Sequence, residues 1–278
     1  MYGSLSVYGT VRNVSKTITK EIKSLNHIFN QIFSEVQFYL VESDSNDNTV
    51  SEMILLKSQL QNFDYVSINN LIHTHPLRTD RIAYCRNIYV KHELNKEKKA
   101  DYSIVMDFDN LNKRINARKI LNSLNRTEKW DVLTANQEGP YYDVFALRHK
   151  YWSPNNFLDE INYMQSICSN KFYLNKLFIY NKQIRIPIDA SLIEVDSAFG
   201  GFAIFKKGVL DKSEYIGIDE NGHEVCEHVE FFKILREKGY RIYIDPQLTN
   251  AKRTEHTKIL YRQKNWLKSI FLRLKMFI

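Results

Sequence analysis

The sequence predicts an α/β fold with a mostly parallel sheet in its first half and antiparallel strands in its second. Apolar runs of strand length alternate with helical patterns over residues 4–110, which is typical of parallel strands joined by crossover helices. One of these runs, residues 104–106, stops abruptly at two aspartates. Beyond residue 110 the alternation loosens, and two strand-like runs flank a turn.

The first half of the chain contains the clearest elements. We expect strands at residues 4–11, 36–41, 65–68 and 104–106, and helices at 18–33, 50–61 and 78–90. Apolar residues recur at helical spacing from Ile18 to Phe33, and Ser15 is a suitable N-cap before them. Residues 42–49 are almost wholly polar and predict a loop after the second strand.

The second half gives a more mixed pattern. We expect an antiparallel pair of strands at 130–135 and 142–147, followed by a helical region at 157–180 and extended chain at 186–195. Further on we expect a strand ending at 205, a helix from 224 to about 238, and a strand at 240–244 that ends at Asp245-Pro246. Gly239 is expected to close the last helix. Gly200 and Gly201, before a strand, suit the close approach of a ligand to the backbone.

The net charge of +7 is concentrated near the C-terminal end. From Lys252 onward there are eight basic residues and one acidic residue, whereas the rest of the chain carries equal numbers of both. This distribution argues against a nucleic-acid partner. Residues 257–278 have a broad apolar face with basic residues mostly off it, which indicates an amphipathic helix on an anionic membrane surface. The alternative is a helix packed on the body or on a partner chain.

Cysteine usage and hydropathy indicate where the protein works. The three cysteines are scattered without metal-type spacing, which favours a reducing compartment. The sequence has neither a signal-peptide pattern nor an apolar run of about 18 residues. Together with the basic tail, these features predict a cytoplasmic protein, peripheral at the inner face of the cytoplasmic membrane.

Asp107 and Asp109 are the leading candidates for a metal site. Side chains two residues apart share one face of a strand, so both carboxylates are expected to point the same way where the strand ends. In open α/β sheets, ligands bind at that edge. Paired carboxylates there suit Mg²⁺ or Mn²⁺ carrying a diphosphate. The alternative is an ordinary Asp-rich turn.

Two arginines on the helix expected at 78–90 also need an explanation. Arg81 and Arg86 cannot both be buried in an apolar core. They are either solvated residues of a surface helix, or at least one of them meets phosphate, which guanidinium geometry favours.

Six segments occur in an order that resembles a known family. They are residues 42–49, 81–87, 105–110, 141–148, 199–205 and 226–229, the last with Asp245-Pro246 further on. Spread over roughly residues 4–250, they resemble the capsular-polysaccharide mannosyltransferases and, more loosely, the GT-A glycosyltransferases, which use nucleotide sugars. The resemblance implies a GT-A-like, Rossmann-type fold. The basic tail is not part of it.

The resemblance also implies roles on the donor side. The end of the first strand and the following polar loop would hold the base and ribose, with Tyr8, Gly9, Thr10, Arg12, Glu42 and Asp44 as the candidate residues. Arg81 and Arg86 would lie near the diphosphate. Asp107 and Asp109 would hold Mn²⁺ or Mg²⁺, and His256 is a candidate third ligand.

On the acceptor side the implied roles are less defined. Asp143 and the Gly200-Gly201 turn would shape the pocket, with Trp130, Tyr141 or Tyr142 as a stacking platform for a sugar ring. Glu227, at the start of a late helix, is placed to deprotonate the acceptor, and His228 could serve instead. If the reaction retains configuration, no dedicated base is needed and Glu227 would contact the acceptor.

The sequence therefore predicts a metal-dependent glycosyltransferase. It would transfer a hexose, such as mannose, from a UDP- or GDP-linked donor to a capsule or lipopolysaccharide type of glycan, or to a lipid-linked glycan. The expected organisation is one domain over 1–250, with a nucleotide-sugar half at 1–110 and an acceptor half at 111–250, followed by a basic tail at 251–278. The alternatives are a sugar nucleotidyltransferase of related fold and a non-catalytic, membrane-tethered scaffold.

Overall fold

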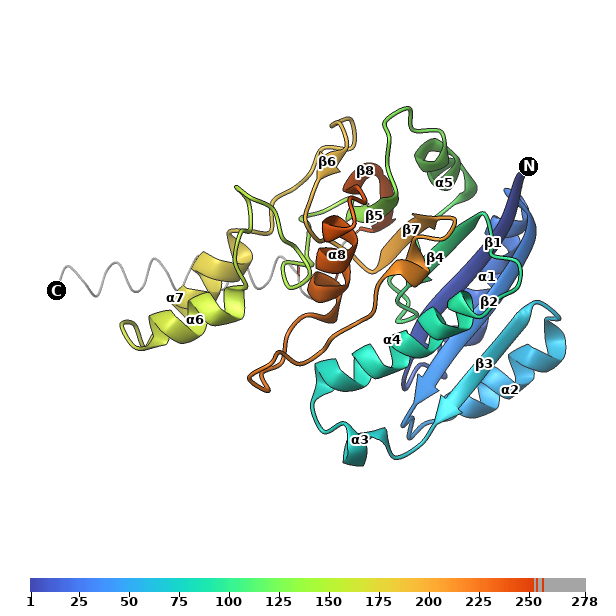
Figure 1. Ribbon diagram of the computed structural model, residues 1–278, viewed down its shortest axis with the longest axis horizontal. Helices are drawn as coiled ribbons and strands as arrows, with labels where there is room; N and C mark the ends of the chain where they lie inside the picture. Colours follow the sequence, from blue (N-terminus) through green and yellow to red (C-terminus); the bar gives the residue numbers. More distant parts are fainter. Residues whose placement is uncertain (253, 255–256, 258–278) are drawn as a thin grey trace.

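The computed structural model describes residues 1–252, 254 and 257. The expected C-terminal helix and His256 therefore lie outside the described residues. Figure 1 shows the order of the elements along the chain. Within the described residues, no helix is both long and apolar enough to cross a membrane.

Strands and helices alternate up to β5 and become less regular afterwards. The strands are β1 (Tyr2–Val11), β2 (Phe33–Ser43), β3 (Phe63–Ile68), β4 (Tyr102–Met106), β5 (Val132–Gln137), β6 (Ile193–Glu194), β7 (Phe202–Lys206) and β8 (Ile242–Ala251). The α-helices are α1 (Ile18–Asn30), α2 (Thr49–Gln59), α3 (Leu71–Thr74), α4 (Arg78–Leu94), α5 (Ala117–Leu124), α6 (Phe157–Gln165), α7 (Lys171–Asn175) and α8 (Glu227–Glu237). A π-helix spans Lys176–Tyr180, and a short 3₁₀ helix spans Leu210–Lys212.

All eight strands form one sheet in the order β3-β2-β1-β4-β7-β5-β8-β6. Strands β3, β2, β1 and β4 are parallel, as are β5 and β8. Strand β7 runs antiparallel to both β4 and β5, and so joins the two parallel groups. This topology confirms the expected α/β fold with a mostly parallel sheet and antiparallel strands in the second half.

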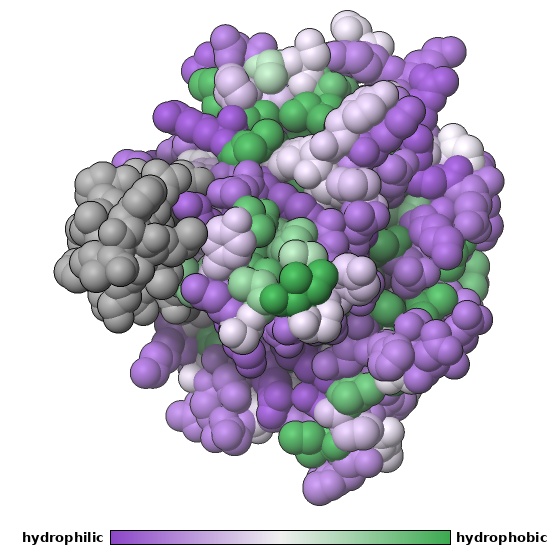
Figure 2. Space-filling model, turned by 90° about the vertical axis from the view of Figure 1, so that its left-hand side faces the viewer, coloured by the Kyte–Doolittle hydropathy of each residue, from purple (hydrophilic) through white to green (hydrophobic). Residues whose placement is uncertain are grey.

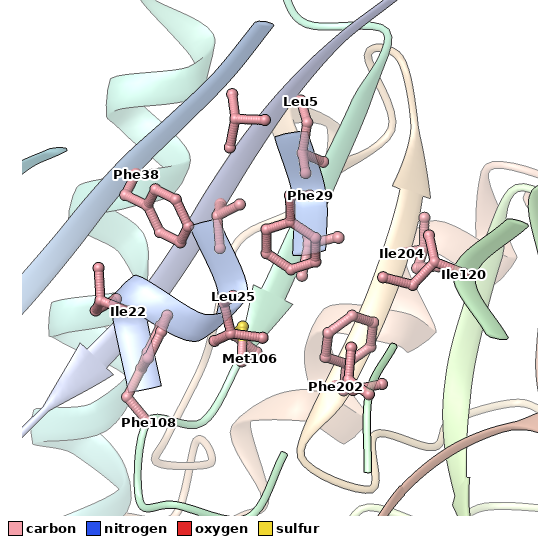
Figure 3. Packing of buried hydrophobic residues seen from close by; sticks show 14 of the residues in the cluster. Leu5, Ile22, Leu25, Phe29, Phe38, Met106, Phe108, Ile120, Phe202 and Ile204 are labelled. Carbon is pink, nitrogen blue, oxygen red and sulfur yellow. The ribbon is translucent and has the colours of Figure 1, made fainter. Parts of the chain in front are cut away.

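Helices cover both faces of the sheet and bury two apolar clusters. On one face, α1, α2 and α5 pack apolar side chains such as Phe29, Met53 and Ile120 against the strands. On the other face, α4 and α8 contribute side chains such as Tyr89 and Phe232. Figure 3 shows the first cluster, in which Phe108 lies beside Ile22 at the end of β4.

Two local predictions were wrong, the first because of a tertiary contact and the second because of a side-chain bond within the segment. Ser15 is not the N-cap of α1, because its hydroxyl donates to Asp47 Oδ2 at 2.7 Å, and Thr17 precedes the helix. Residues 142–147 form a turn instead of a strand, because the Asp143 carboxylate accepts from Ala146 N at 3.2 Å within it.

Three boundaries also differ from expectation. Strand β8 does not end at Asp245-Pro246 but continues to Ala251, with register shifts against β5 beside that point. The helical region at 157–180 is divided between α6, α7 and the π-helix. In the stretch at 186–195, strand pairing is confined to β6.

Candidate active site

A cavity of about 870 Å³ lies at the carboxyl ends of β1, β2 and β4. One side is lined by the ends of these strands and the first turns of α4, the other by residues 142–146, Phe199 and the start of α8. Because parallel strands present their carboxyl ends at one sheet edge, this is the position where α/β folds bind ligands. The cavity therefore joins the two halves of the chain.

Asp107 and Asp109 both line this cavity, whereas Phe108 between them is only 1% exposed. The backbone around Asp107 is fixed from two sides, because its N–H donates to Gly201 O at 3.1 Å and its carbonyl accepts from Asn112 Nδ2 at 2.6 Å. Asp109 Oδ1 accepts from Leu111 N at 3.2 Å. The pair is thus held on a short loop with a buried aromatic anchor.

A third carboxylate lies beside this loop and was missed by the sequence reasoning. Glu21 Oε2 accepts from the backbone N–H of Asn110 at 3.0 Å, and its Oε1 is buried without a hydrogen-bond partner. Burial raises the pKa of Glu21 to about 7, and the nearby charges of Asp109 and Asp107 add to the increase. Three acidic side chains therefore lie close together here, and the raised pKa favours the protonated form of Glu21. Glu21 gives no local signal, because it reads as a polar residue of an amphipathic helix.

Arg86 lies at the junction of the two sides of the cavity. Its side chain is buried, donates from Nη2 to Asp107 Oδ1 and from Nε to Glu227 Oε1, each at 3.2 Å, and also bonds Tyr89 Oη. The guanidinium carbon lies 5.3 Å from the ring centroid of Phe199. Three of the five N–H groups of Arg86 are thus bonded to protein groups, and its role near a diphosphate stays a prediction.

Three other arginines line the cavity: Arg12, Arg78 and Arg81. Arg12 Nε donates to Asp44 O at 3.2 Å, and Arg81 Nη1 donates to the carbonyls of His75 and Pro76. Carbonyl partners fix a guanidinium without neutralising its charge. These side chains consequently supply positive charge at the cavity surface.

Glu227 and His228 form the first turn of α8 and face the cavity from the side formed by the second half of the chain. Burial raises the pKa of Glu227, while the charge of Arg86 acts in the opposite direction. The His228 ring stacks on Phe199 with centroids 3.8 Å apart, and neither ring nitrogen has a hydrogen-bond partner. Burial lowers the pKa of His228 well below its ordinary value, and Arg86 lowers it further, so the ring is neutral.

Asp143 lines the cavity and is bonded to the turn that contains Gly200 and Gly201. Asp143 Oδ2 accepts from Gly200 N at 2.9 Å, and burial raises the pKa of Asp143 to about 6. Gly200 and Gly201 have φ of +66° and +81°, a region that favours glycine. Behind this turn, Asn250 Nδ2 donates to Gly200 O at 2.7 Å.

Asn250 also connects this turn to the aspartate loop. Its side-chain amide donates to Asn112 Oδ1 at 3.0 Å, and Asn112 in turn donates to the carbonyl of Asp107. Both amides are buried. Neither residue was a candidate from the sequence, because their partners are distant in the chain and a single asparagine carries no pattern.

The structure brings most of the predicted site residues to the cavity, but not all. Those that line it are Thr10, Arg12, Arg81, Arg86, Asp107, Asp109, Tyr142, Asp143, Glu227 and His228. Tyr8 is instead buried on the α4 side and donates to Glu93 Oε2 at 2.5 Å. Gly9 lies beneath the aspartate loop, where a Cβ would come within 2.4 Å of Met106 O.

Four more of the predicted residues do not line the cavity. Glu42 is fully buried and accepts from Ser45 N at 2.9 Å and from the Ser67 hydroxyl. The Asp44 carboxylate accepts from the backbone at the start of α3. Trp130 is a core residue stacked on Tyr102, and Tyr141 is fully buried, so neither lines the cavity as a stacking platform. Tyr142 alone of the three aromatic candidates lines the cavity.

The donor set at this edge fits a hard divalent cation that shares its coordination with phosphate. Mg²⁺ is commonly bound through one or two carboxylates, with substrate phosphates and water completing the shell. Asp107 and Asp109 supply two such groups. Over the described part of the chain, no group of three or more His, Cys, Asp or Glu side chains is arranged to hold a metal by itself.

Comparison with solved structures supports the fold. A mannosyltransferase from Pyrobaculum calidifontis, solved with GDP-Man and Mn²⁺, superposes with a TM-score of 0.51 at 12% identity over 96% of this chain and 64% of that one. TarS from S. aureus (residues 1–349) gives 0.46 at 16% identity over 88% and 58%. Glucosyl-3-phosphoglycerate synthase from Mycobacterium tuberculosis, with UDP, gives 0.42 at 10% identity over 91% and 72%.

The chain thus spans about three fifths of the length of the first two structures. No protein-family model matches the sequence, and no curated protein matches it. The similarity to the mannosyltransferase shows that the chain has the GT-A type of α/β fold expected from the sequence.

Proposed function

We propose that this protein is a metal-dependent glycosyltransferase that uses a nucleotide-sugar donor. The observation that carries the proposal is the arrangement of one cavity: two carboxylates and several arginines lie on the strand-end side, and a buried glutamate lies on the opposite side. A sugar-nucleotide diphosphate needs the first group of residues, and an acceptor hydroxyl needs the second. The GT-A type of fold agrees with this division.

On the donor side, Thr10 and Arg12 at the end of β1 would contact the nucleoside, and Arg81 would contact the diphosphate. Asp107 and Asp109 would hold Mn²⁺ or Mg²⁺. When bound, such an ion neutralises the charge that develops on the leaving diphosphate. Arg12 and Arg81 already have their guanidinium groups fixed by backbone carbonyls, which lowers the entropic cost of binding an anion.

On the acceptor side, Glu227 is our candidate base. Its carboxylate is buried, and its hydrogen bond to Arg86 at 3.2 Å favours the ionised form that could accept a proton. Neutral His228 beside it offers its one unprotonated ring nitrogen as an alternative acceptor. In a reaction that retains configuration, Glu227 would bind the acceptor instead.

We further propose a surface glycan or a lipid-linked glycan as the acceptor, with a hexose such as mannose as the transferred sugar. The basic composition of residues 251–278, with eight basic residues and one acidic residue from Lys252 onward, supports work at the inner face of an anionic cytoplasmic membrane.

Two other functions would use the same fold. A sugar nucleotidyltransferase would release pyrophosphate from a nucleoside triphosphate, and the loop after β1 would then need glycines and basic residues, where this chain offers Gly9 and Arg12. A non-catalytic scaffold would be indifferent to the aspartates of the cavity.

The test is an activity assay with the purified protein, Mn²⁺ and a panel of UDP- and GDP-sugars. A glycosyltransferase should hydrolyse one of them slowly in the absence of acceptor, and Asp107→Asn and Asp109→Asn should each abolish this while the protein stays folded. Pyrophosphate release from a nucleoside triphosphate would support the nucleotidyltransferase. No turnover of any donor would support the scaffold.

A further inference from the structure

The segment that carries the acceptor end of the cavity also exposes an unusual amount of apolar surface. Four large side chains of α6, α7 and the loop between them are open to solvent: Leu158 (36%), Tyr163 (72%), Ile167 (68%) and Tyr173 (49%). We call these four residues the α6–α7 face. Helices this short bury little of their own surface, so such side chains would normally be polar.

The chain around this face carries a net positive charge, although helix α6 itself holds two acidic residues, Asp159 and Glu160. Residues 145–188 contain six basic and two acidic residues. Among the basic ones, Lys150, Lys171 and Arg185 are exposed, whereas Lys182 pairs with Glu160 at 2.6 Å. Figure 2 looks onto the side from which α6 and α7 project, and shows hydrophobic side chains exposed among hydrophilic ones. An apolar face with a basic surround complements an anionic surface.

From these observations we propose that the α6–α7 face docks onto an anionic membrane surface. Two of its four residues are tyrosines, whose apolar rings and polar hydroxyls suit the boundary between headgroups and acyl chains. Lysine and arginine side chains around it would contact acidic headgroups, each contributing about 1 kcal/mol near such a surface.

The α6–α7 face lies close to the cavity. Phe157 of α6 and Ile179 and Tyr180 of the π-helix line the cavity itself. A membrane bound at the α6–α7 face would therefore lie next to the acceptor end of the cavity. A lipid-linked acceptor could then reach Glu227 while its lipid stays in the membrane. The docking contact itself does not depend on the glycosyl-transfer reaction.

The experiment compares binding of the full chain to vesicles of phosphatidylcholine alone and to vesicles with equal amounts of phosphatidylcholine and phosphatidylglycerol. The test variant is the triple substitution Tyr163→Ser, Ile167→Ser and Tyr173→Ser. The control is Ile54→Ser with Leu55→Ser, which removes two exposed apolar side chains (58% and 44%) from α2. All variants keep residues 251–278, so any contribution of the tail is constant.

We expect the triple variant to bind the anionic vesicles at least about tenfold more weakly than the wild type, because three inserted side chains are lost. The α2 control should bind like the wild type. Equal binding by the triple variant and the wild type would overturn the proposal, as would failure of the wild type to bind anionic vesicles at all. A change from dimer to monomer in light scattering, without a change in vesicle binding, would assign the face to a second copy of the chain.

A second variant guards against misfolding. Ile167→Asp places one charge on an exposed position and should weaken vesicle binding without lowering the melting temperature. Nucleoside diphosphate binding, measured on the same samples, separates the two proposals. If that binding persists while vesicle binding is lost, the docking surface is confirmed independently of the catalytic site.

Discussion

Arg86 Nε donates a hydrogen bond to Glu227 Oε1 at 3.2 Å, although 141 positions separate the two residues. The same guanidinium bonds Asp107, so one buried cation joins the strand end that would hold the donor to the helix that would hold the acceptor. Its rigidity is reinforced by the rings of Phe199 and Tyr215. This bridge is the structural link between the two halves of the proposed reaction.

Replacing Arg86 should therefore be costly to stability. Arg86→Met would leave Asp107 and Glu227 without their buried counter-charge, and removing one partner of a buried pair costs about 3–5 kcal/mol. Arg81→Met, on the same helix, loses bonds to two carbonyls at the cavity surface and should cost about 1 kcal/mol. Urea denaturation measures both. Similar losses for the two variants would show that Arg86 is not a structural bridge.

Glu227 should matter for turnover more than for donor binding. Glu227→Gln keeps the shape of the side chain but removes the basic carboxylate, so we expect kcat to fall by about 10²–10⁴-fold. Nucleoside diphosphate affinity should change little. Glu230→Gln on the same helix is the matched control and should keep wild-type turnover. Wild-type kcat in Glu227→Gln would exclude the base assignment.

The turn at Gly201 should not tolerate a side chain. Gly201→Ala combines a φ of +81° with a Cβ only 2.4 Å from Leu111 Cδ2. Gly239→Ala has a similar φ of +84° but nothing within 4 Å of its Cβ. The conformational strain alone costs roughly 1–2 kcal/mol, so Gly239→Ala should lose about that much and Gly201→Ala more. Equal losses of unfolding free energy would mean that the contact around Gly201 relaxes freely.

The free energy of unfolding should fall as pH rises from the ordinary glutamate pKa to the raised pKa of Glu21. Its pKa is raised to about 7, so the folded protein holds this proton after the unfolded chain has lost it. The contribution of Glu21 to the free energy of unfolding is therefore fully present below the ordinary glutamate pKa. It is lost as pH rises towards 7. In EDTA, Glu21→Gln should therefore flatten the decline in melting temperature over that interval.

Part of the decline should persist in Glu21→Gln, because the pKa of Asp143 is also raised, to about 6. Glu35→Gln, at an exposed position of β2, is the matched control. A pH profile in Glu21→Gln identical to that of the wild type would exclude Glu21 as the source.

The fold and the main candidates followed from local pattern, because that pattern and the tertiary packing agree in the first half. Period-two alternation predicted that Asp107 and Asp109 share a direction, and both line the cavity while Phe108 packs in the core. The strand-like run of residues at 142–147 was misleading. There the Asp143 carboxylate accepts from Ala146 N and Gly200 N, and these bonds hold the chain in a turn.

The missed residues share a physical reason. Glu21, Asn112 and Asn250 act through partners that lie near them only after the sheet has formed, so nothing in their own neighbourhood marks them. Glu42 shows the reverse error: it follows a strand as a ribose-binding carboxylate would. Its oxygens are instead taken by Ser45 and Ser67.

The most direct test of the central claim is the thermal stability of the protein with UDP or GDP, measured with and without Mn²⁺. One nucleoside diphosphate should stabilise the wild type by about 2.7 kcal/mol at a concentration of about 100 Kd, and only when Mn²⁺ is present. Asp107→Asn and Asp109→Asn should remain folded and lose that stabilisation. A metal-dependent diphosphate site at Asp107 and Asp109 would be contradicted if neither nucleotide shifted the melting temperature with Mn²⁺, or if both variants responded like the wild type.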